Sequence, residues 1–374
     1  MANHPYSSIP SHQRWRAAMG ATVPAEVDPV VAMPFRIARH EKVATAGSCF
    51  AQHIGRHLAS RGFTALVTES AHPVVPPETA KEMQYGVYTA RYGNIYTTRQ
   101  ALQLLRRAFG RFTPREEPWT DGAGNWFDPF RPAIQPGGFT SREELEADRA
   151  QHLRAVRTMF ETADVLVFTL GLTEAWVSRD DGAVFPVCPG VTGGTFDADR
   201  YAFVNFTADE VLADLRAFLA EARAVRPKLR VVVTVSPVPL AATAEPRHVW
   251  TSTTYSKAAL RVVAEAIAKE PYTAYFPSYE VITSPASRGA YYTDDLRTVT
   301  ETGVEHVMRL FFRHLAEEGA DQASDNAREN AVTDANATAR EAMARAKEAV
   351  DVICEENALD VAENLASKNE GEVR

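Results

Sequence analysis

The chain lacks an excess of basic charge and long apolar runs, and each absence excludes a class of protein. Its 40 lysine and arginine residues are outnumbered by 48 aspartate and glutamate residues, so the formal net charge is −8. Non-specific binding to nucleic acid or to an anionic membrane needs a cationic surface, and we expect neither. No apolar run approaches the roughly 18 residues of a membrane span, and the polar start, Met1 to Ile9, lacks the apolar core of a secretory signal.

Cysteine and cofactor motifs are also scarce. The three cysteines, Cys49, Cys188 and Cys354, cannot form a disulfide framework, and their spacing matches no zinc motif. The sequence contains no glycine-rich nucleotide-binding pattern and no His/Asp/Glu cluster at metal-ligand spacing. These absences predict a protein of the reducing cytoplasm that uses no cofactor and binds no metal.

Five short apolar segments are predicted as strands, and helical patterns alternate with them. The third and fourth segments are nearly continuous in apolar residues, which is typical of strands buried on both faces of a parallel sheet. The alternation predicts an α/β fold, a flavodoxin-like doubly wound parallel sheet in the order 2-1-3-4-5 with helices on both faces. The five segments are residues 42–46, 63–67, 165–170, 230–235 and 273–277.

Two capping-box patterns, at residues 140–143 and 207–210, predict the first turns of helices. The first of these helices is expected to end near Thr162. Further helices are predicted over residues 48–60, 98–109, 256–269 and 302–318.

Three regions fall outside the predicted sheet and its helices. Residues 69–139 are rich in proline, glycine, tryptophan and tyrosine, and because this stretch is too long for a plain connection it is predicted to be a cap-like insertion. Residues 178–206 are predicted as a second long loop. Residues 319–374 are rich in alanine and acidic residues and predict a helical tail that either docks on the body or mediates oligomerisation. We therefore predict one domain over residues 1–318, followed by the tail.

Polar residues follow the predicted strands at their carboxyl ends, where doubly wound sheets bind ligands. After the first strand, Gly47 permits a tight turn, and Ser48 falls near a helix N-terminus, where its hydroxyl is exposed and its N–H can face a developing oxyanion. The alternative is that Ser48 only caps its helix. After the third strand, Gly171 permits close backbone approach, while Thr173 and Glu174 supply a donor and a charge.

Candidate bases and carboxylates follow the later strands. His248 lies on the loop after the fourth strand, although a single loop histidine is more often an ordinary surface residue. After the fifth strand, Asp294 and Asp295 precede the last helix, which carries His306. A carboxylate here could orient an imidazole, as in Ser-His-Asp catalysis, or it could only favour the positive N-terminus of that helix.

The pentapeptide Gly47-Ser48-Cys49-Phe50-Ala51 is the motif of the GSCFA family, a branch that resembles the SGNH (GDSL-like) hydrolases. The likeness extends to residues 92–96, 169–174, 234–238 and 275–280, and these blocks cover the chain from about residue 4 to residue 315. The resemblance implies an SGNH-like fold. It further implies a serine esterase that acts on an O-acylated substrate, which is a small molecule or a carbohydrate ester.

The resemblance also assigns roles to individual residues. The serine of the first SGNH block is the nucleophile, which corresponds to Ser48. The oxyanion hole of these enzymes uses that serine's N–H, a glycine of the second block and an asparagine of the third. The second block corresponds to Gly93 with Asn94, and in the third block Thr173 follows Gly171 where the asparagine is expected. A threonine hydroxyl can still donate one hydrogen bond.

The last block departs from the SGNH pattern, in which aspartate and histidine stand three residues apart. Asp295 fits the aspartate, but Thr298 occupies the histidine position. A serine hydroxyl is a weak acid and needs a base, so another group must serve. His248 and His306 are the candidates, while His53 on the helix after Ser48 is expected to face away.

Two other functions remain open. Cys49 could be the nucleophile, because a thiol at a helix N-terminus needs less help from a base. Alternatively, Thr298 at the histidine position fits a non-catalytic or O-acyl-transferring carbohydrate-binding module. The aromatic residues of the insertion could stack on sugars in such a module, although they could equally form the core of the cap. These residues are Tyr85, Tyr88, Tyr92, Tyr96, Trp119 and Trp126.

Overall fold

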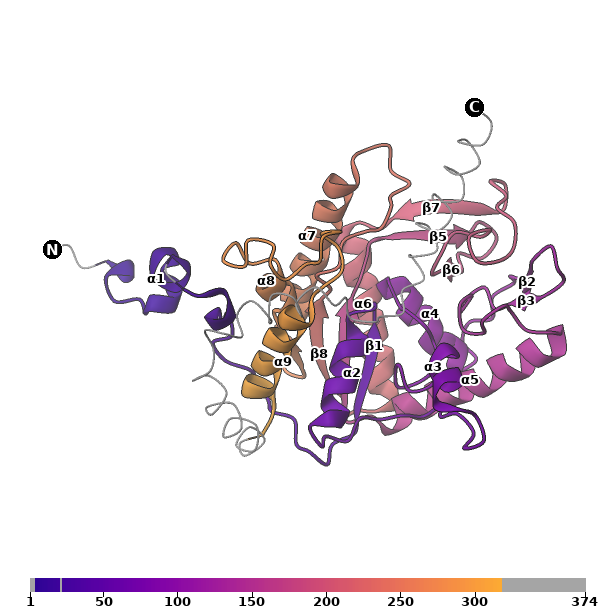
Figure 1. The fold of residues 1–374 in the computed structure, drawn as a ribbon, viewed down its shortest axis with the longest axis horizontal. Helices are drawn as coiled ribbons and strands as arrows, with labels where there is room; N and C mark the ends of the chain where they lie inside the picture. Colours follow the sequence, from indigo (N-terminus) through magenta and orange to yellow (C-terminus); the bar gives the residue numbers. More distant parts are fainter. Residues whose placement is uncertain (1–3, 21, 318–374) are drawn as a thin grey trace. The chain divides into compact units, whose positions relative to one another are not determined.

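The computed structural model describes residues 4–20 and 22–317 (Figure 1). These residues divide into two compact units. The larger unit contains residues 37–275, and the smaller one contains residues 4–36 and 276–317. The predicted tail at residues 319–374 lies outside the described part of the chain. Among the described residues, no helix combines the length and the apolar character needed to cross a bilayer.

A central parallel sheet of four strands organises the larger unit, and the α/β class is therefore confirmed. Its strand order is β1-β4-β8-β9, and every neighbouring pair is parallel. The strands β1 and β4 are entirely buried, as their apolar sequences predict. At the carboxyl end of β1, Gly47 pairs with Thr169 of β4. The four strands are β1 (Val43–Gly47), β4 (Val165–Leu170), β8 (Arg230–Val235) and β9 (Thr273–Tyr275).

The segment predicted as the second strand, residues 63–67, forms only one isolated parallel bridge, between Ala65 and Val43 of β1. The five-strand order is consequently not confirmed. Within β1, the N–H and C=O of Val43 are the groups that bond this segment. Val67, at its end, is 47% exposed, so the segment leaves the edge of β1 instead of extending along it.

Helices cover both faces of the sheet. On one face, Gly55 of α2 lies against the side chain of Thr45 in β1. On the other, the ring of Phe218 in α6 packs 5.5 Å from Phe168 of β4 and 5.8 Å from Phe160 of α5. The helices of this unit are α2 (Ala51–Ser60), α3 (Pro77–Glu82), α4 (Thr98–Ala108), α5 (Arg142–Thr162), α6 (Ala208–Val225) and α7 (Val249–Ile267).

The capping signals define two of these helix starts. Thr207 and Glu210 form both halves of the predicted capping box at the start of α6. At α5, Ser141 is the cap and accepts from the Glu144 N–H, one residue later than the predicted box. Helix α7 begins seven residues before the predicted 256–269 segment, with His248 as its cap.

The predicted loop at residues 178–206 is wrong, because this region forms part of an antiparallel sheet of order β6-β5-β7. The small sheet lies beside α4 (Figure 1), and Gln103 of α4 bonds the backbone of Gly182 and Val184. Its strands are β5 (Glu174–Ser178), β6 (Val184–Phe185) and β7 (Tyr201–Asn205), and a separate hairpin consists of β2 (Trp119–Thr120) and β3 (Trp126–Phe127). A shared aromatic cluster contains Trp119, Phe127, Phe130, Phe185 and Tyr201.

The smaller unit is helical. The ring of Phe276 packs 5.3 Å from that of Phe311, and His314 Nε2 lies 2.8 Å from the Asp28 carboxylate. Its α-helices are α1 (Trp15–Met19), α8 (Ser278–Ile282) and α9 (Glu301–Leu315). Short 3-10 turns span Pro5–Ser7, Ser11–Gln13 and Pro24–Glu26.

Candidate functional site

Ser48 lies directly after β1, at the carboxyl end of the central sheet. The turn before it requires glycine, because Gly47 has a φ of +128° and a Cβ there would collide with the Thr169 carbonyl. The Ser48 N–H donates to that same carbonyl over 3.2 Å. The residue is only 3% exposed, and its hydroxyl has no hydrogen-bond partner in the described part of the chain.

The hydroxyl of Ser48 does not cap the following helix. Helix α2 begins at Ala51, and its N-cap residue is Phe50, whose side chain makes no capping hydrogen bond. Ser48 contributes only its backbone carbonyl, which accepts from the Ala51 N–H over 2.9 Å. A buried hydroxyl without a partner costs about 1–3 kcal/mol, so an unpaired serine at this position calls for a reason other than capping.

Two other predicted segments meet Ser48. A Cβ built on Gly171 would lie 3.0 Å from the Ser48 Cβ and 2.9 Å from the Tyr96 carbonyl oxygen. The Gly171 N–H donates to that carbonyl over 3.2 Å, and the Ile95 N–H donates to Gly47 over 2.8 Å. The first, second and third sequence blocks therefore converge at one end of the sheet.

The second block holds a buried amide. Gly93 takes the left-handed φ of +67°, and Asn94 is 1% exposed. The Tyr88 hydroxyl donates to Asn94 Oδ1 over 2.5 Å and accepts from Gln52 Nε2 over 3.1 Å. This bond orients the Asn94 carboxamide, with its oxygen toward Tyr88.

The polar residues after Gly171 form hydrogen bonds with other segments of the larger unit. The Thr173 hydroxyl donates to Asn205 Oδ1 over 2.8 Å, and the Thr173 N–H donates to the Ser256 hydroxyl of α7 over 3.0 Å. Glu174 accepts from the Thr243 hydroxyl over 2.8 Å, and burial raises the pKa of its carboxyl above the usual range. The donor group of Thr173 is thus engaged with β7 in this conformation.

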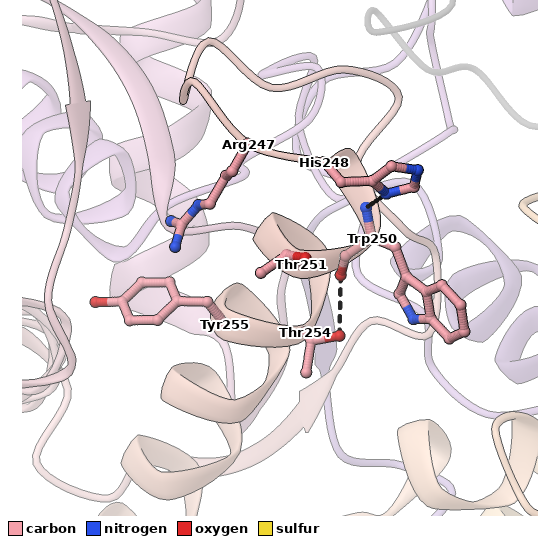
Figure 2. Close-up of a pocket in the computed structure, with 6 residues that line it drawn as sticks. All are labelled: Arg247, His248, Trp250, Thr251, Thr254 and Tyr255. Atoms are coloured by element: carbon pink, nitrogen blue, oxygen red, sulfur yellow. Dashed lines mark hydrogen bonds between the residues drawn. The ribbon is translucent and has the colours of Figure 1, made fainter.

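None of the histidine contacts that the structure describes joins an imidazole to Ser48. His248 caps α7, and its Nδ1 accepts the Trp250 N–H over 3.1 Å (Figure 2). Since Nδ1 is an acceptor, the proton of the neutral ring resides on Nε2. His53 has its Nδ1 2.9 Å from the guanidinium of Arg56, and burial, with the Arg56 charge, lowers its pKa to about 3.

The remaining predicted triad members belong to the smaller unit. His306 Nδ1 lies 2.8 Å from the Tyr291 hydroxyl, and burial lowers the pKa of this imidazole to about 4. Asp295 is exposed, and it accepts the hydroxyl protons of both Thr293 and Thr298 over 2.6 Å. Burial alone would raise the pKa of Asp295, but these bonds outweigh it and hold the pKa at about 2. Thr298, at the expected histidine position, therefore bonds the aspartate through its hydroxyl.

Lys257 is a buried residue near the site that the sequence reading missed. It is 1% exposed, and its Nζ donates to the Gly171 carbonyl over 2.8 Å. The available signal was its position in α7, three and seven residues before the buried Leu260 and Ala264. A lysine on the inward face of an amphipathic helix is uncommon and marks a specific partner.

An open pocket of about 720 Å³ lies over the first turns of α7 (Figure 2). Trp250 is 75% exposed and Tyr255 is 36% exposed, and Figure 2 shows the two rings on opposite sides of the helix with threonines between them. The lining residues are Arg247, His248, Trp250, Thr251, Thr254 and Tyr255. The aromatic residues of the insertion differ, since Tyr88, Tyr92, Tyr96 and Trp119 are at most 4% exposed.

The fold and the site define an α/β protein whose central sheet presents a buried serine on a glycine-dependent turn. A family model described as the GSCFA family matches residues 42–311, and the chain belongs to this family. The match contains Ser48, Gly171 and Lys257. Neither the curated proteins nor the solved structures include a match to the chain.

Proposed function

We propose that the chain is a serine esterase of the SGNH type and that it hydrolyses O-acyl groups with Ser48 as the nucleophile. The observation that carries this proposal is the Ser48 hydroxyl, which is buried and unpaired at the carboxyl end of the sheet, where α/β proteins place their ligands. Because Ser48 does not cap α2, the capping explanation for this serine falls away.

The relation to the SGNH fold is part of the proposal. In a sheet of order 2-1-3-4-5, the second strand pairs with the edge of β1 that β4 leaves open. The parallel bridge between Ala65 and Val43 lies where such a pairing would be, and it supports this assignment.

The proposed reaction has two halves. Ser48 Oγ attacks the ester carbonyl and forms a tetrahedral oxyanion, the alcohol leaves, and water then hydrolyses the acyl-serine. The N–H groups of Ser48 and Gly171 already donate to Thr169 and Tyr96. We assign the stabilisation of the oxyanion to the side chain of Asn94, which the Tyr88 hydroxyl orients and which belongs to the second block beside Gly47.

A carbohydrate is the proposed carrier of the acyl group. Exposed Trp250 and Tyr255 rings offer apolar faces for sugars, and the threonines and Arg247 of the pocket offer hydrogen-bond donors. Helix α7 connects this pocket with the serine, because Ser256 and Lys257, just after the pocket residues, bond Thr173 and Gly171.

Ser48→Ala tests the proposal, with Ser60→Ala as its matched control because Ser60 is an exposed serine of α2. We expect Ser48→Ala to abolish both labelling by a fluorophosphonate and hydrolysis of p-nitrophenyl acetate, and Ser60→Ala to retain them. Labelling of Ser48→Ala at the rate of the unaltered chain would refute the proposal.

The second candidate function is a carbohydrate-binding module without turnover. The observation that favours it is that the Ser48 hydroxyl bonds to no described group, while Thr298 bonds Asp295 in place of a histidine. Calorimetric titration with acetylated and deacetylated xylo-oligosaccharides separates the two functions. Binding of both ligands with no release of acetate would select the binding module.

A further inference from the structure

A cluster of charged side chains lies where the insertion packs on α5, and its positive charges outnumber its negative ones. Among the described residues it contains four arginines and three carboxylates, which leaves a surplus of one positive charge. His152, beside Glu69, adds no charge at neutral pH, because burial lowers its pKa to about 4. The members are Arg91, Arg107, Arg131 and Arg149 with Glu69, Asp128 and Asp148.

Three of the four arginines are paired with carboxylates. The Arg91 guanidinium lies 2.7 Å from the Asp148 carboxylate. The Arg131 guanidinium lies 2.8 Å from Asp148 and 2.9 Å from Asp128. The Arg149 guanidinium lies 3.1 Å from Asp128. The surplus positive charge therefore belongs to the fourth arginine.

Arg107, in the last turn of α4, is that arginine. Its side chain makes no hydrogen bond or ion pair with the described residues, and its guanidinium lies 3.9 Å above the Phe130 ring. Burial lowers its pKa to about 10, and the charge of Asp128 opposes this shift while those of Arg149 and Arg131 add to it. Because an arginine keeps its proton in proteins, the charge remains, and a nearby anion would offset the cost of burying it.

A cavity of about 20 Å³ lies beside Arg107. None of the described residues that line it is acidic, and its two glutamines already bond the backbone. Gln100 accepts the Tyr96 N–H and donates to the Asn94 carbonyl. Gln103 bonds the β5–β6 hairpin in the same two ways. The guanidinium of Arg107 is consequently the cation that the cavity offers to a ligand without the loss of an existing bond.

The cavity has room for one small ion. A single water molecule needs about 10–15 Å³, so the volume admits a monatomic anion such as chloride but not the four oxygens of sulfate or phosphate. Chloride accepts hydrogen bonds and has none to donate. It therefore suits a site whose available groups are the N–H donors of a guanidinium.

We propose that this cavity is a chloride site and that the bound ion neutralises Arg107. The proposal is independent of the esterase function. Its effect reaches the second block, because Gln100, which lines the cavity, holds Asn94 and Tyr96. The ion therefore supports the segment that meets Gly47.

A hydrated arginine that is held by the Phe130 ring alone is the competing explanation. The face of an aromatic ring attracts a cation, and water can bond the rest of the guanidinium. In that case the stability of the chain would respond to ionic strength but not to the identity of the anion. A change of anion at constant ionic strength therefore separates the two explanations.

The test compares the full chain in sodium chloride and in sodium gluconate, whose anion is too large for the cavity, at equal ionic strength. We expect the melting temperature to be about 3 °C higher in chloride once chloride is about tenfold above its dissociation constant. The NMR line of the chloride nucleus should broaden when the chain is added, and sulfate should not displace the bound ion. Arg107→Gln should lose both effects, whereas Arg154→Gln, at an exposed arginine of α5, should keep them.

Equal melting temperatures in chloride and gluconate would overturn the proposal, and so would chloride binding that survives Arg107→Gln. Displacement of the ion by sulfate would contradict the assignment to so small a cavity. Should Arg107→Gln not fold, as judged by circular dichroism, anomalous scattering from bromide in crystals of the unaltered chain decides. A peak beside the Arg107 guanidinium supports the site, and its absence refutes it.

Discussion

Gly171→Ala probes the contact on which the candidate site depends. The added Cβ would lie 2.9 Å from the Tyr96 carbonyl oxygen, 3.2 Å from the Tyr96 Cα and 3.0 Å from the Ser48 Cβ. Two of these neighbours are backbone atoms that cannot turn away, so the methyl group must displace the chain. Overpacking of this kind costs about 1–3 kcal/mol, which corresponds to a fall in melting temperature on the order of 5 °C.

Gly122→Ala is the matched control, because a Cβ at Gly122 would have no atom within 4 Å. Urea unfolding of the two variants, followed by circular dichroism, gives the free-energy difference directly. We also expect Gly171→Ala to slow phosphonate labelling, because the methyl group pushes on Ser48. If the two variants unfold within about 0.5 kcal/mol of each other, the close packing of Gly171 on Ser48 is refuted.

Three further predictions follow from individual contacts. His248→Ala should cost about 0.5–2 kcal/mol in urea unfolding because α7 loses its cap, and His248→Asn should recover most of this loss. Asp295 has a folded pKa of about 2, below its unfolded value near 4, so its stabilisation is present above about pH 4 and lost as the pH falls through 2. The stability difference between the unaltered chain and Asp295→Asn should therefore shrink over this interval, and a constant difference would contradict the assignment. Trp250→Ala should weaken xylo-oligosaccharide binding about 2–10-fold in calorimetry, whereas Trp15→Ala, at another exposed tryptophan, should not.

The strands of the central sheet were predictable where local sequence alone decides burial. The segments Val165–Leu170 and Arg230–Val235 have the predicted bounds, because an apolar run buried on both faces admits little else. The segment at 63–67 is also mostly apolar. Whether it forms a strand depends on how many residues of β1 it pairs with. Within β1 only Val43 bonds it, and a local pattern contains no information on that choice.

The missed elements depend on partners that are distant in the chain. The short strands β5, β6 and β7 pack their aromatic residues against Trp119 and Phe127 of the insertion, so their stability is not visible in residues 178–206 alone. The start of α7 was missed because β-branched residues such as Thr251 and Thr253 disfavour helix locally, while the His248 cap and buried packing favour it.

The same distinction applies to the site. The Gly47–Ser48 turn was predictable because a glycine before a helix start is a local signal. The bond between Lys257 and Gly171 joins residues 86 positions apart, and no local pattern identifies the acceptor. Asp295 was predicted either to orient a histidine or to favour the helix N-terminus. In the structure its carboxylate accepts hydrogen bonds from Thr293 and Thr298 in its own loop.

Buried charges in the insertion provide the support for the second block. Arg91, two residues before Gly93, bonds Asp148 over 2.7 Å, and its N–H donates to Glu69 over 2.8 Å. Arg131 bonds the same Asp148 over 2.8 Å. Paired charges at such depth add little net stability, because desolvation offsets their attraction, so their effect is to fix position. The insertion therefore supports the segment that meets Gly47 and Gly171, and loosening the pairing should disturb the serine site before it unfolds the sheet.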